Sequence, residues 1–302
     1  MSAFRAAGAY APALRDFQHK PWRVIARCAE GARSRVEDLG VDPDHLVPFF
    51  ETEEGQAFMR TGGKDSDAWP GRLALAVRRC YISDDAVRAE AARTGCTHEE
   101  IIASKMPNPG SVMAGDFGEI LTFLLQNVLE RPAILVGPKK WRLKQDRTKP
   151  ISHCDVVLFD LPTWPDASPG DRLLCAEVKT KATDSASTPI PSAIADCRKD
   201  RTTRLAKTLV WLRERALTEN LGTVTLQHLN RFIDALEHPE AERRFRAVVV
   251  ICHSLVEEEL STLPDDVPAE CELHVVSVDE LKRSYEAVFE AALVAVPPGV
   301  TG

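Results

Sequence analysis

The chain has 302 residues, of which 44% are hydrophobic and 27% are charged. Thirty-eight basic residues against 45 acidic ones give a formal net charge of -7 at pH 7. These values are typical of a folded globular protein with one large or two ordinary domains, and they exclude a disordered or fibrous chain. Unbroken apolar runs such as 247–252 are far shorter than the roughly 18 residues that cross a bilayer, so we expect no membrane association.

The N-terminus and the cysteines indicate the compartment. Residues 1–10 contain one arginine and lack the apolar core of a secretory signal, so we expect a cytoplasmic protein. The eight cysteines are scattered without a Cys-x-x-Cys spacing, which predicts reduced and mostly buried thiols. His153 and Cys154 are adjacent, but no second Cys/His pair nearby completes a zinc site.

Residues 1–110 are expected to form an accessory, mainly helical region that docks a partner. Amphipathic stretches predict helices at 22–39, 72–80 and 84–93. Gly62-Gly63 and the Pro/Gly-rich segment 107–110 interrupt the pattern. This region carries no recognisable catalytic motif, and the predicted domain boundary lies at 110/111.

Residues 111–302 predict an α/β domain. Apolar residues at helical spacing indicate a first helix at 116–130. Alternating or strongly apolar runs predict three strands, at 139–144, 154–160 and 172–179, the last two joined by the turn-rich segment 162–170. The remaining elements are a long helix at 192–215, a helix at 226–236, strands at 246–252 and 273–278, and a helix at 279–294.

Acidic residues and a lysine lie at the ends of these elements. Asp155 is beside an apolar strand, and Glu177 and Lys179 are on one face of the next, because side chains two apart on a strand point the same way. Burying such charges singly is expensive, so they must be paired or bind a cation. Carboxylates suit Mg²⁺ or Mn²⁺, and a lysine beside the metal orients or deprotonates a water molecule.

This arrangement resembles the PD-(D/E)XK nuclease superfamily. Asp155, a 21-residue gap and Glu177-Val-Lys179 follow a helix that carries Glu119. The resemblance covers about residues 113–255 and implies a restriction-endonuclease-like core of helix, three strands, helix and strand. It also implies that Asp155, Glu177 and Glu119 bind the metal and that Lys179 assists the attacking water. The proline of the superfamily name is absent here, since His153-Cys154 precedes the aspartate.

Four segments carry a narrower resemblance, to the HamA nucleases of Hachiman-type antiphage systems: GDFGEILTFLL at 115–125, KKWR at 139–142, HCDVVL at 153–158 and AEVKTK at 176–181. This resemblance implies an effector that degrades DNA and works with a helicase partner. Residues 1–110 would then be the docking surface.

Chance and structural alternatives remain for each part of the motif. A second acid-x-Lys match, Glu280-Leu-Lys282, follows Ser277 in a capping-box pattern, which favours a solvated helix end. Glu119 also fits a capping box that begins at Asp116. The cluster of Asp155, Glu177 and Lys179 could itself be a structural ion pair at a strand end.

Basic residues concentrate near the predicted site. Segment 131–150 has seven basic residues and one acidic residue, and segment 196–215 has seven and three. Such clusters supply most of the non-specific affinity for DNA, although a solvated protein face is the alternative. The predicted nucleic-acid-binding residues are Lys139, Lys140, Arg142, Lys144, Lys181, Lys199, Arg201 and Arg204.

Two functions therefore remain open from the sequence. The first is an Mg²⁺-dependent deoxyribonuclease. The second is a nucleic-acid-binding or scaffold subunit that keeps the fold without cleaving.

Overall fold

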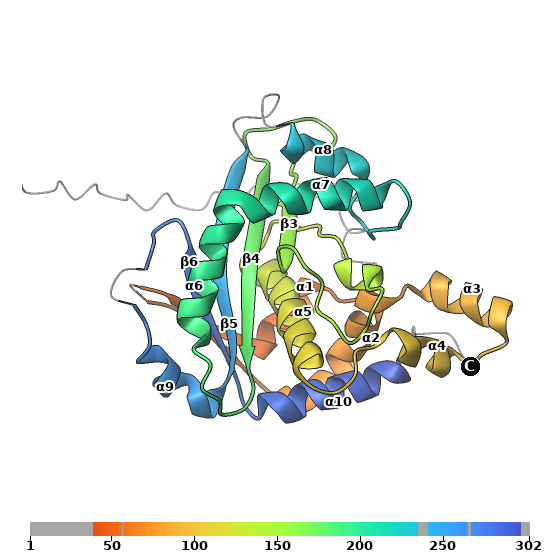
Figure 1. The fold of residues 1–302 in the computed structure, drawn as a ribbon, viewed down its shortest axis with the longest axis horizontal. Helices are drawn as coiled ribbons and strands as arrows, with labels where there is room; N and C mark the ends of the chain where they lie inside the picture. The colour runs from red at the N-terminus through yellow and green to blue at the C-terminus, as the bar shows by residue number, and fades with distance from the viewer. Residues whose placement is uncertain (1–38, 56, 235–240, 265–266, 297–302) are drawn as a thin grey trace, which may run out of the picture. The chain divides into compact units, whose positions relative to one another are not determined.

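Within the described residues, six strands form one mixed sheet in the order β1-β2-β6-β5-β4-β3. Figure 1 labels four of its strands, β3 to β6. The computed structural model describes residues 39–55, 57–234, 241–264 and 267–296, so the helix predicted at 22–39 lies almost entirely outside the described residues. The strands are β1 (Phe50–Glu54), β2 (Met59–Gly63), β3 (Val156–Asp160), β4 (Arg172–Lys181), β5 (Glu242–Cys252) and β6 (Glu272–Val278). The expected α/β class is confirmed.

The strand directions follow from the connections. β3 and β4 are antiparallel neighbours, as the predicted hairpin requires, whereas β4, β5, β6 and β2 are parallel to one another. A parallel pair needs a crossover connection, which α6, α7 and α8 provide between β4 and β5. β1 closes the other edge by pairing antiparallel with β2.

Helices cover both faces of the sheet. The helices before β3 are α1 (Pro43–Leu46), α2 (Trp69–Tyr81), α3 (Asp84–Thr94), α4 (His98–Lys105) and α5 (Ser111–Leu129). The later helices are α6 (Pro189–Lys199), α7 (Leu205–Ala216), α8 (Leu226–Ile233), α9 (Val256–Leu260) and α10 (Leu281–Leu293). One buried cluster joins α2, α5 and α10 to the sheet, and another joins α6, α7 and α8 to the opposite face.

β4 shows how the alternation of a strand separates these two layers. Leu174, Ala176 and Val178 belong to the cluster beneath α5, as the sequence predicts. Leu173 and Cys175 belong to the cluster beneath α6 and α7. Because side chains two apart share a face, Glu177 lies on the side of α6 and α7.

The strand predicted at 139–144 is wrong. These residues form a short 3-10 helix, Lys140–Leu143, in which Trp141 is buried and Lys144 follows the last turn. A 3-10 turn that packs on α5 buries Trp141 between charged neighbours, which gives the same alternation as a half-buried strand. The Trp141 ring packs edge-on against Phe123 of α5.

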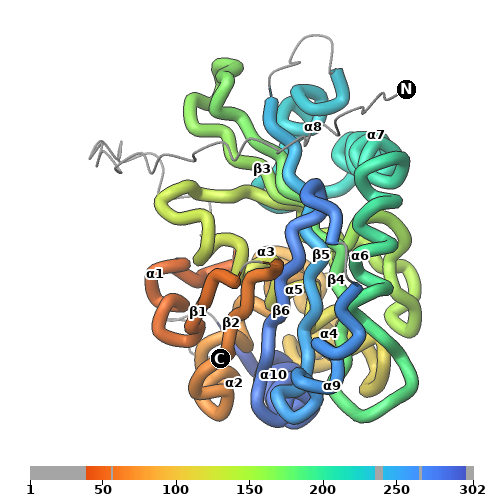
Figure 2. The backbone as a smooth tube through the Cα atoms, turned by 90° about the vertical axis from the view of Figure 1, so that its left-hand side faces the viewer, coloured from red at the N-terminus to blue at the C-terminus, as the bar shows by residue number. Residues whose placement is uncertain are grey.

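The predicted boundary at residue 110 does not separate two units in the described chain. β2 pairs with β6, so the hairpin β1–β2 belongs to the same sheet as the predicted nuclease elements, as Figure 2 also shows. Trp69 of α2 lies in one buried cluster with Phe117 of α5 and Tyr285 of α10. The described part of this region, 39–55 and 57–110, is mainly helical as expected. Its polar β-hairpin has too little hydrophobic alternation to be recognised as strands from the sequence.

α5 is the central helix of one layer. Its 19 residues have the length and mean hydropathy, 1.2, of a membrane span, but 78% of that stretch is buried inside the protein, as in a core helix. α5 begins at Ser111, five residues before Asp116, so the capping box predicted at Asp116 and Glu119 is wrong. The capping box predicted at Ser277 is also wrong, because that residue still belongs to β6.

Candidate active site

Asp155 is fixed against β4 by a backbone hydrogen bond. The β3–β4 pairing ends at Val156 and Ala176, and Asp155 is the residue just before β3. Its Oδ2 accepts a hydrogen bond from the Val178 N–H at 2.8 Å. The Asp155 carboxylate therefore lies beside Val178, the residue between Glu177 and Lys179 in the sequence motif.

Glu119 reaches the same region from the other layer. It lies on α5 and is 9% exposed, and its Oε2 accepts a hydrogen bond from the Trp141 indole N–H at 2.9 Å. The Lys140 ammonium lies 3.2 Å from this oxygen and 3.7 Å from Asp155 Oδ1. Lys140 thus joins Glu119 to Asp155.

Glu177 is held by two cations. Its Oε1 accepts a hydrogen bond from Lys179 Nζ at 2.7 Å, and its Oε2 accepts one from an Arg204 guanidinium nitrogen at 2.8 Å. Glu177 is only 2% exposed. The structure therefore brings together Glu177 and Lys179 as predicted, and adds Arg204 to them.

Lys179 also contacts Asp196 of α6, with 2.7 Å between Nζ and Oδ2. Burial alone would lower the pKa of Lys179, but the hydrogen bonds to Asp196 and Glu177 outweigh it and raise the pKa above its ordinary value. Asp196 responds in the opposite direction, since its bonds to Lys179 and Lys199 outweigh burial and lower its pKa to about 2. Asp196 and Glu177 therefore both favour the ammonium form of Lys179.

The buried carboxyls have strongly perturbed acidity. Burial, together with the charge of Asp155, raises the pKa of Glu177 to about 8. Burial raises the pKa of Glu119 to about 8 as well, against the opposing charge of Lys140. Both carboxyls are also affected by the charge of Asp155. Strongly shifted carboxyls from different elements around one residue are typical of functional sites.

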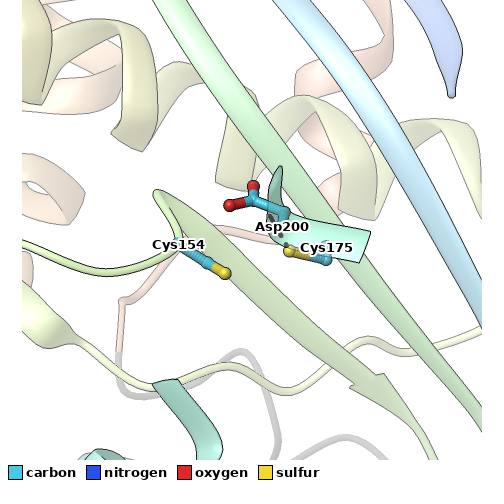
Figure 3. A group of neighbouring side chains, drawn as sticks. All are labelled: Cys154, Cys175 and Asp200. Atoms are coloured by element: carbon cyan, nitrogen blue, oxygen red, sulfur yellow. Dashed lines mark hydrogen bonds between the residues drawn. The ribbon is translucent and has the colours of Figure 1, made fainter. Parts of the chain in front are cut away.

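A thiol cluster lies behind this site. Figure 3 shows Cys154, Cys175 and Asp200, whose sulfur and oxygen atoms lie within 4.8 Å of one another. Asp200 Oδ1 is 3.1 Å from an Arg204 nitrogen, and that arginine also binds Glu177. Among the described residues, these are the three side chains of metal-binding type whose ligand atoms lie this close together. Glu119 and Asp155 are instead separated by the Lys140 ammonium.

The loop before Asp155 is strained. His153 has a φ of 100°, which a residue other than glycine rarely adopts, and its ring stacks on Trp211 of α7 with 4.4 Å between centroids. An open cavity of about 250 Å³ adjoins this stack, and its lining includes Lys149 and Arg215. A surface with cationic and aromatic side chains therefore lies beside the site.

Several predicted nucleic-acid-binding residues are inside the protein, which is a correction to the sequence analysis. Lys139, Lys140 and Lys181 are 2%, 5% and 4% exposed, and the Lys144 side chain is 4% exposed. Lys144 pairs with Asp116 and Lys181 with Glu259. Lys139 instead donates to the Gly137 carbonyl oxygen and lies over the Phe123 ring. In this conformation the charges of Lys140, Lys144 and Lys181 are paired with buried carboxylates and are not available to a phosphate.

The remaining four are less buried. Arg142 donates two hydrogen bonds to the Arg79 carbonyl oxygen. Lys199 and Arg201 have side chains 63% and 49% exposed, and Arg204 is 28% exposed. Lys199 and Arg201 are therefore the two of the eight that solvent reaches most.

Sequence reasoning missed the roles of Asp196 and Asp200 and misassigned Lys140 and Arg204. The spacing of Asp196, Asp200 and Arg204 was a usable signal, because residues four apart lie on one helix face. A π-helical turn at Asp200–Arg204 separates α6 from α7, and the sequence pattern does not predict it. Such turns occur often at functional sites.

A family model described as HamA matches residues 57–292 of the chain. The match begins after β1 and includes Glu119, Asp155, Glu177 and Lys179. No curated protein matches the chain.

Proposed function

The chain belongs to the HamA family, and from this premise we propose that it is a metal-dependent nuclease that hydrolyses phosphodiester bonds of DNA in Hachiman-type antiphage defence, in the cytoplasm and together with a helicase. The observation that carries the proposal is that Asp155 lies beside Glu177 and Lys179 where β3 stops pairing with β4. The PD-(D/E)XK resemblance assigns a role to each of these side chains.

Mg²⁺ or Mn²⁺ fits the chemistry of the donors. Asp155 and Glu177 offer carboxylate oxygens, the ligand type these ions prefer, and Glu119 adds a third from α5. The Lys140 ammonium between Glu119 and Asp155 supports the fit, because it places a positive charge between the same oxygens. A bound ion would polarise the phosphate and lower the pKa of a water molecule.

The residues of the site have separate roles in this reaction. Lys179, held as an ammonium by Glu177 and Asp196, donates hydrogen bonds and orients the attacking water. Arg204 fixes the Glu177 carboxylate from the other side. The open cavity beside His153 and Trp211 supplies cationic and aromatic groups for a nucleic-acid strand.

One observation favours the second candidate, a non-catalytic nucleic-acid-binding subunit. Lys140, Lys179 and Arg204 already compensate the buried carboxylates, so their charge is offset without a metal. In that case the residues of the motif are structural.

One experiment separates the two. The purified chain, alone and with its co-expressed helicase, is incubated with supercoiled plasmid and Mg²⁺ or Mn²⁺, beside Glu177→Ala and Lys179→Ala. Lys282→Ala is the matched control, since it removes the lysine of the other acid-x-Lys match, whose side chain is 56% exposed. We expect cleavage by the wild type and Lys282→Ala only. Equal behaviour of all four proteins in every condition would establish the scaffold.

A further inference from the structure

The Lys140 ammonium occupies an oxygen-lined position inside the protein. Its Nζ lies 3.2 Å from Glu119 Oε2, 3.7 Å from Asp155 Oδ1 and 3.2 Å from the Cys154 carbonyl oxygen. The Lys140 side chain is 6% exposed. Three oxygen atoms from two segments, α5 and the two residues before β3, therefore surround one positive charge.

These oxygens are also the ones that a divalent ion would use. Two carboxylates and a backbone carbonyl form a hard-oxygen donor set. An ammonium and a divalent ion cannot occupy this position together, because both need the same lone pairs and two positive charges repel at this distance. The lysine and the ion therefore compete.

The segment that carries Lys140 is anchored to two helices of one layer, α2 and α5. Arg142 donates to the Arg79 carbonyl oxygen at the end of α2. Lys144 binds Asp116 of α5, with 2.5 Å and 2.7 Å from Nζ to the two carboxylate oxygens. Lys140 is thus held in place by its neighbours and not only by its own contacts.

We propose that Lys140 is a built-in cation that occupies the metal position between Glu119 and Asp155, so that a divalent ion binds there only after the lysine has withdrawn. The inference rests on the proposed function, since it concerns the metal of the same site. Its consequence is quantitative. The apparent association constant for the ion equals the intrinsic constant multiplied by the fraction of molecules in which Lys140 has withdrawn from Glu119 and Asp155.

The first test measures Mn²⁺ binding by titration calorimetry and by electron paramagnetic resonance, without DNA. Lys140→Met keeps the length of the side chain and removes the charge. Lys282→Met is the control, because it removes an exposed lysine outside the site that pairs with Glu286. We expect Lys140→Met to bind Mn²⁺ at least about tenfold more tightly than the wild type, and Lys282→Met to stay within about twofold of it.

The second test uses the wild-type protein, so that it does not depend on the folding of a variant. Reductive methylation is followed residue by residue by mass spectrometry, with and without Mn²⁺. Lys140 is expected to be unreactive without the ion and to become reactive with it, while the buried Lys144 remains unreactive as an internal reference.

The outcomes separate this inference from the proposed function. If the wild type binds Mn²⁺, if Asp155→Asn abolishes that binding, and if Lys140→Met is no tighter, the competition is disproved and the metal site stands. Methylation of Lys140 that is unchanged by bound Mn²⁺ disproves it equally. If neither the wild type nor Lys140→Met binds Mn²⁺, the metal-dependent nuclease and the competition both fail.

Discussion

The Asp155 carboxylate accepts a hydrogen bond from the Val178 backbone N–H, at the point where β3 stops pairing with β4. One side chain thus has two duties. It completes the hydrogen bonding of β4, and it holds a carboxylate between the two other residues of the motif.

Asp155→Asn and Asp155→Ala separate these duties. An asparagine oxygen still accepts from Val178, so we expect Asn to keep the free energy of unfolding within about 0.5 kcal/mol of the wild type, whereas Ala lowers it by about 1 kcal/mol. Both variants should lose at least about a hundredfold in DNA cleavage, because both remove the metal-binding charge. Urea denaturation and a plasmid assay measure the two effects. Cleavage retained by the Asn variant would remove Asp155 from the metal site.

Arg204→Ala tests whether the arginine positions Glu177. The change leaves the buried carboxyls of Glu177 and Asp200 without their shared cation. We expect a loss of about 2 kcal/mol in the free energy of unfolding, less than for a fully buried pair because the Arg204 side chain is 28% exposed. Lys199→Ala, which removes an exposed partner of Asp196, should change it by less than about 0.5 kcal/mol. Equal losses in both variants would contradict the positioning role.

Lys181 is a structural cation in the described fold. Its ammonium binds Glu259 and the Ser187 carbonyl oxygen, and both side chains of the ion pair are 3% exposed. Lys181→Met should destabilise the protein by about 3 kcal/mol, since it leaves the Glu259 carboxylate buried and unpaired. The double variant Lys181→Met/Glu259→Gln should recover part of that loss.

DNA affinity is the second readout for this pair. The folded fraction of Lys181→Met should bind a DNA duplex as the wild type does. Normal stability combined with weaker DNA binding would instead restore the phosphate contact that the sequence predicted for Lys181.

His274 makes the stability depend on pH. Burial lowers its pKa to about 3, and the charge of Arg246 adds to this effect. Because the folded pKa lies below the ordinary value of 6.5, the unfolded chain binds the proton first. The stabilisation is therefore present above pH 6.5 and is lost as the pH falls toward 3.

At pH 5 the loss due to His274 should reach about 2 kcal/mol relative to pH 7. His274→Gln still offers a hydrogen-bonding group to the Thr61 hydroxyl and does not titrate. Denaturation at both pH values should therefore show a smaller pH dependence in this variant than in the wild type. An unchanged pH dependence would show that His274 is already protonated or is solvated in the folded protein.

Local pattern was sufficient for much of the described fold. Strand alternation separated Leu174, Ala176 and Val178 from Glu177, because the period of a strand is a property of the backbone. Helical spacing predicted α2, α3 and α5, and the antiparallel pair β3–β4 followed from two apolar runs around a turn-rich segment. The motif by itself predicted that Asp155 lies near Glu177 and Lys179.

Other features depended on contacts between distant segments. The strand expected at 139–144 is a 3-10 turn because Trp141 packs on Phe123 and donates to Glu119, neither of which is a sequence neighbour. The hairpin β1–β2 is part of the sheet because β2 pairs with β6, more than 200 residues later. Composition and spacing do not encode such a partner.

For the candidate site, the sequence by itself determined which side chains share a face of β4, since that depends only on their spacing. The tertiary structure decided which cations compensate them. Lys140 and Lys181 read as surface charges along the chain, yet each is buried against a carboxylate brought in by another element. Burying a lysine's charge costs free energy unless a carboxylate or another acceptor lies beside it, and the tertiary fold decides whether one does.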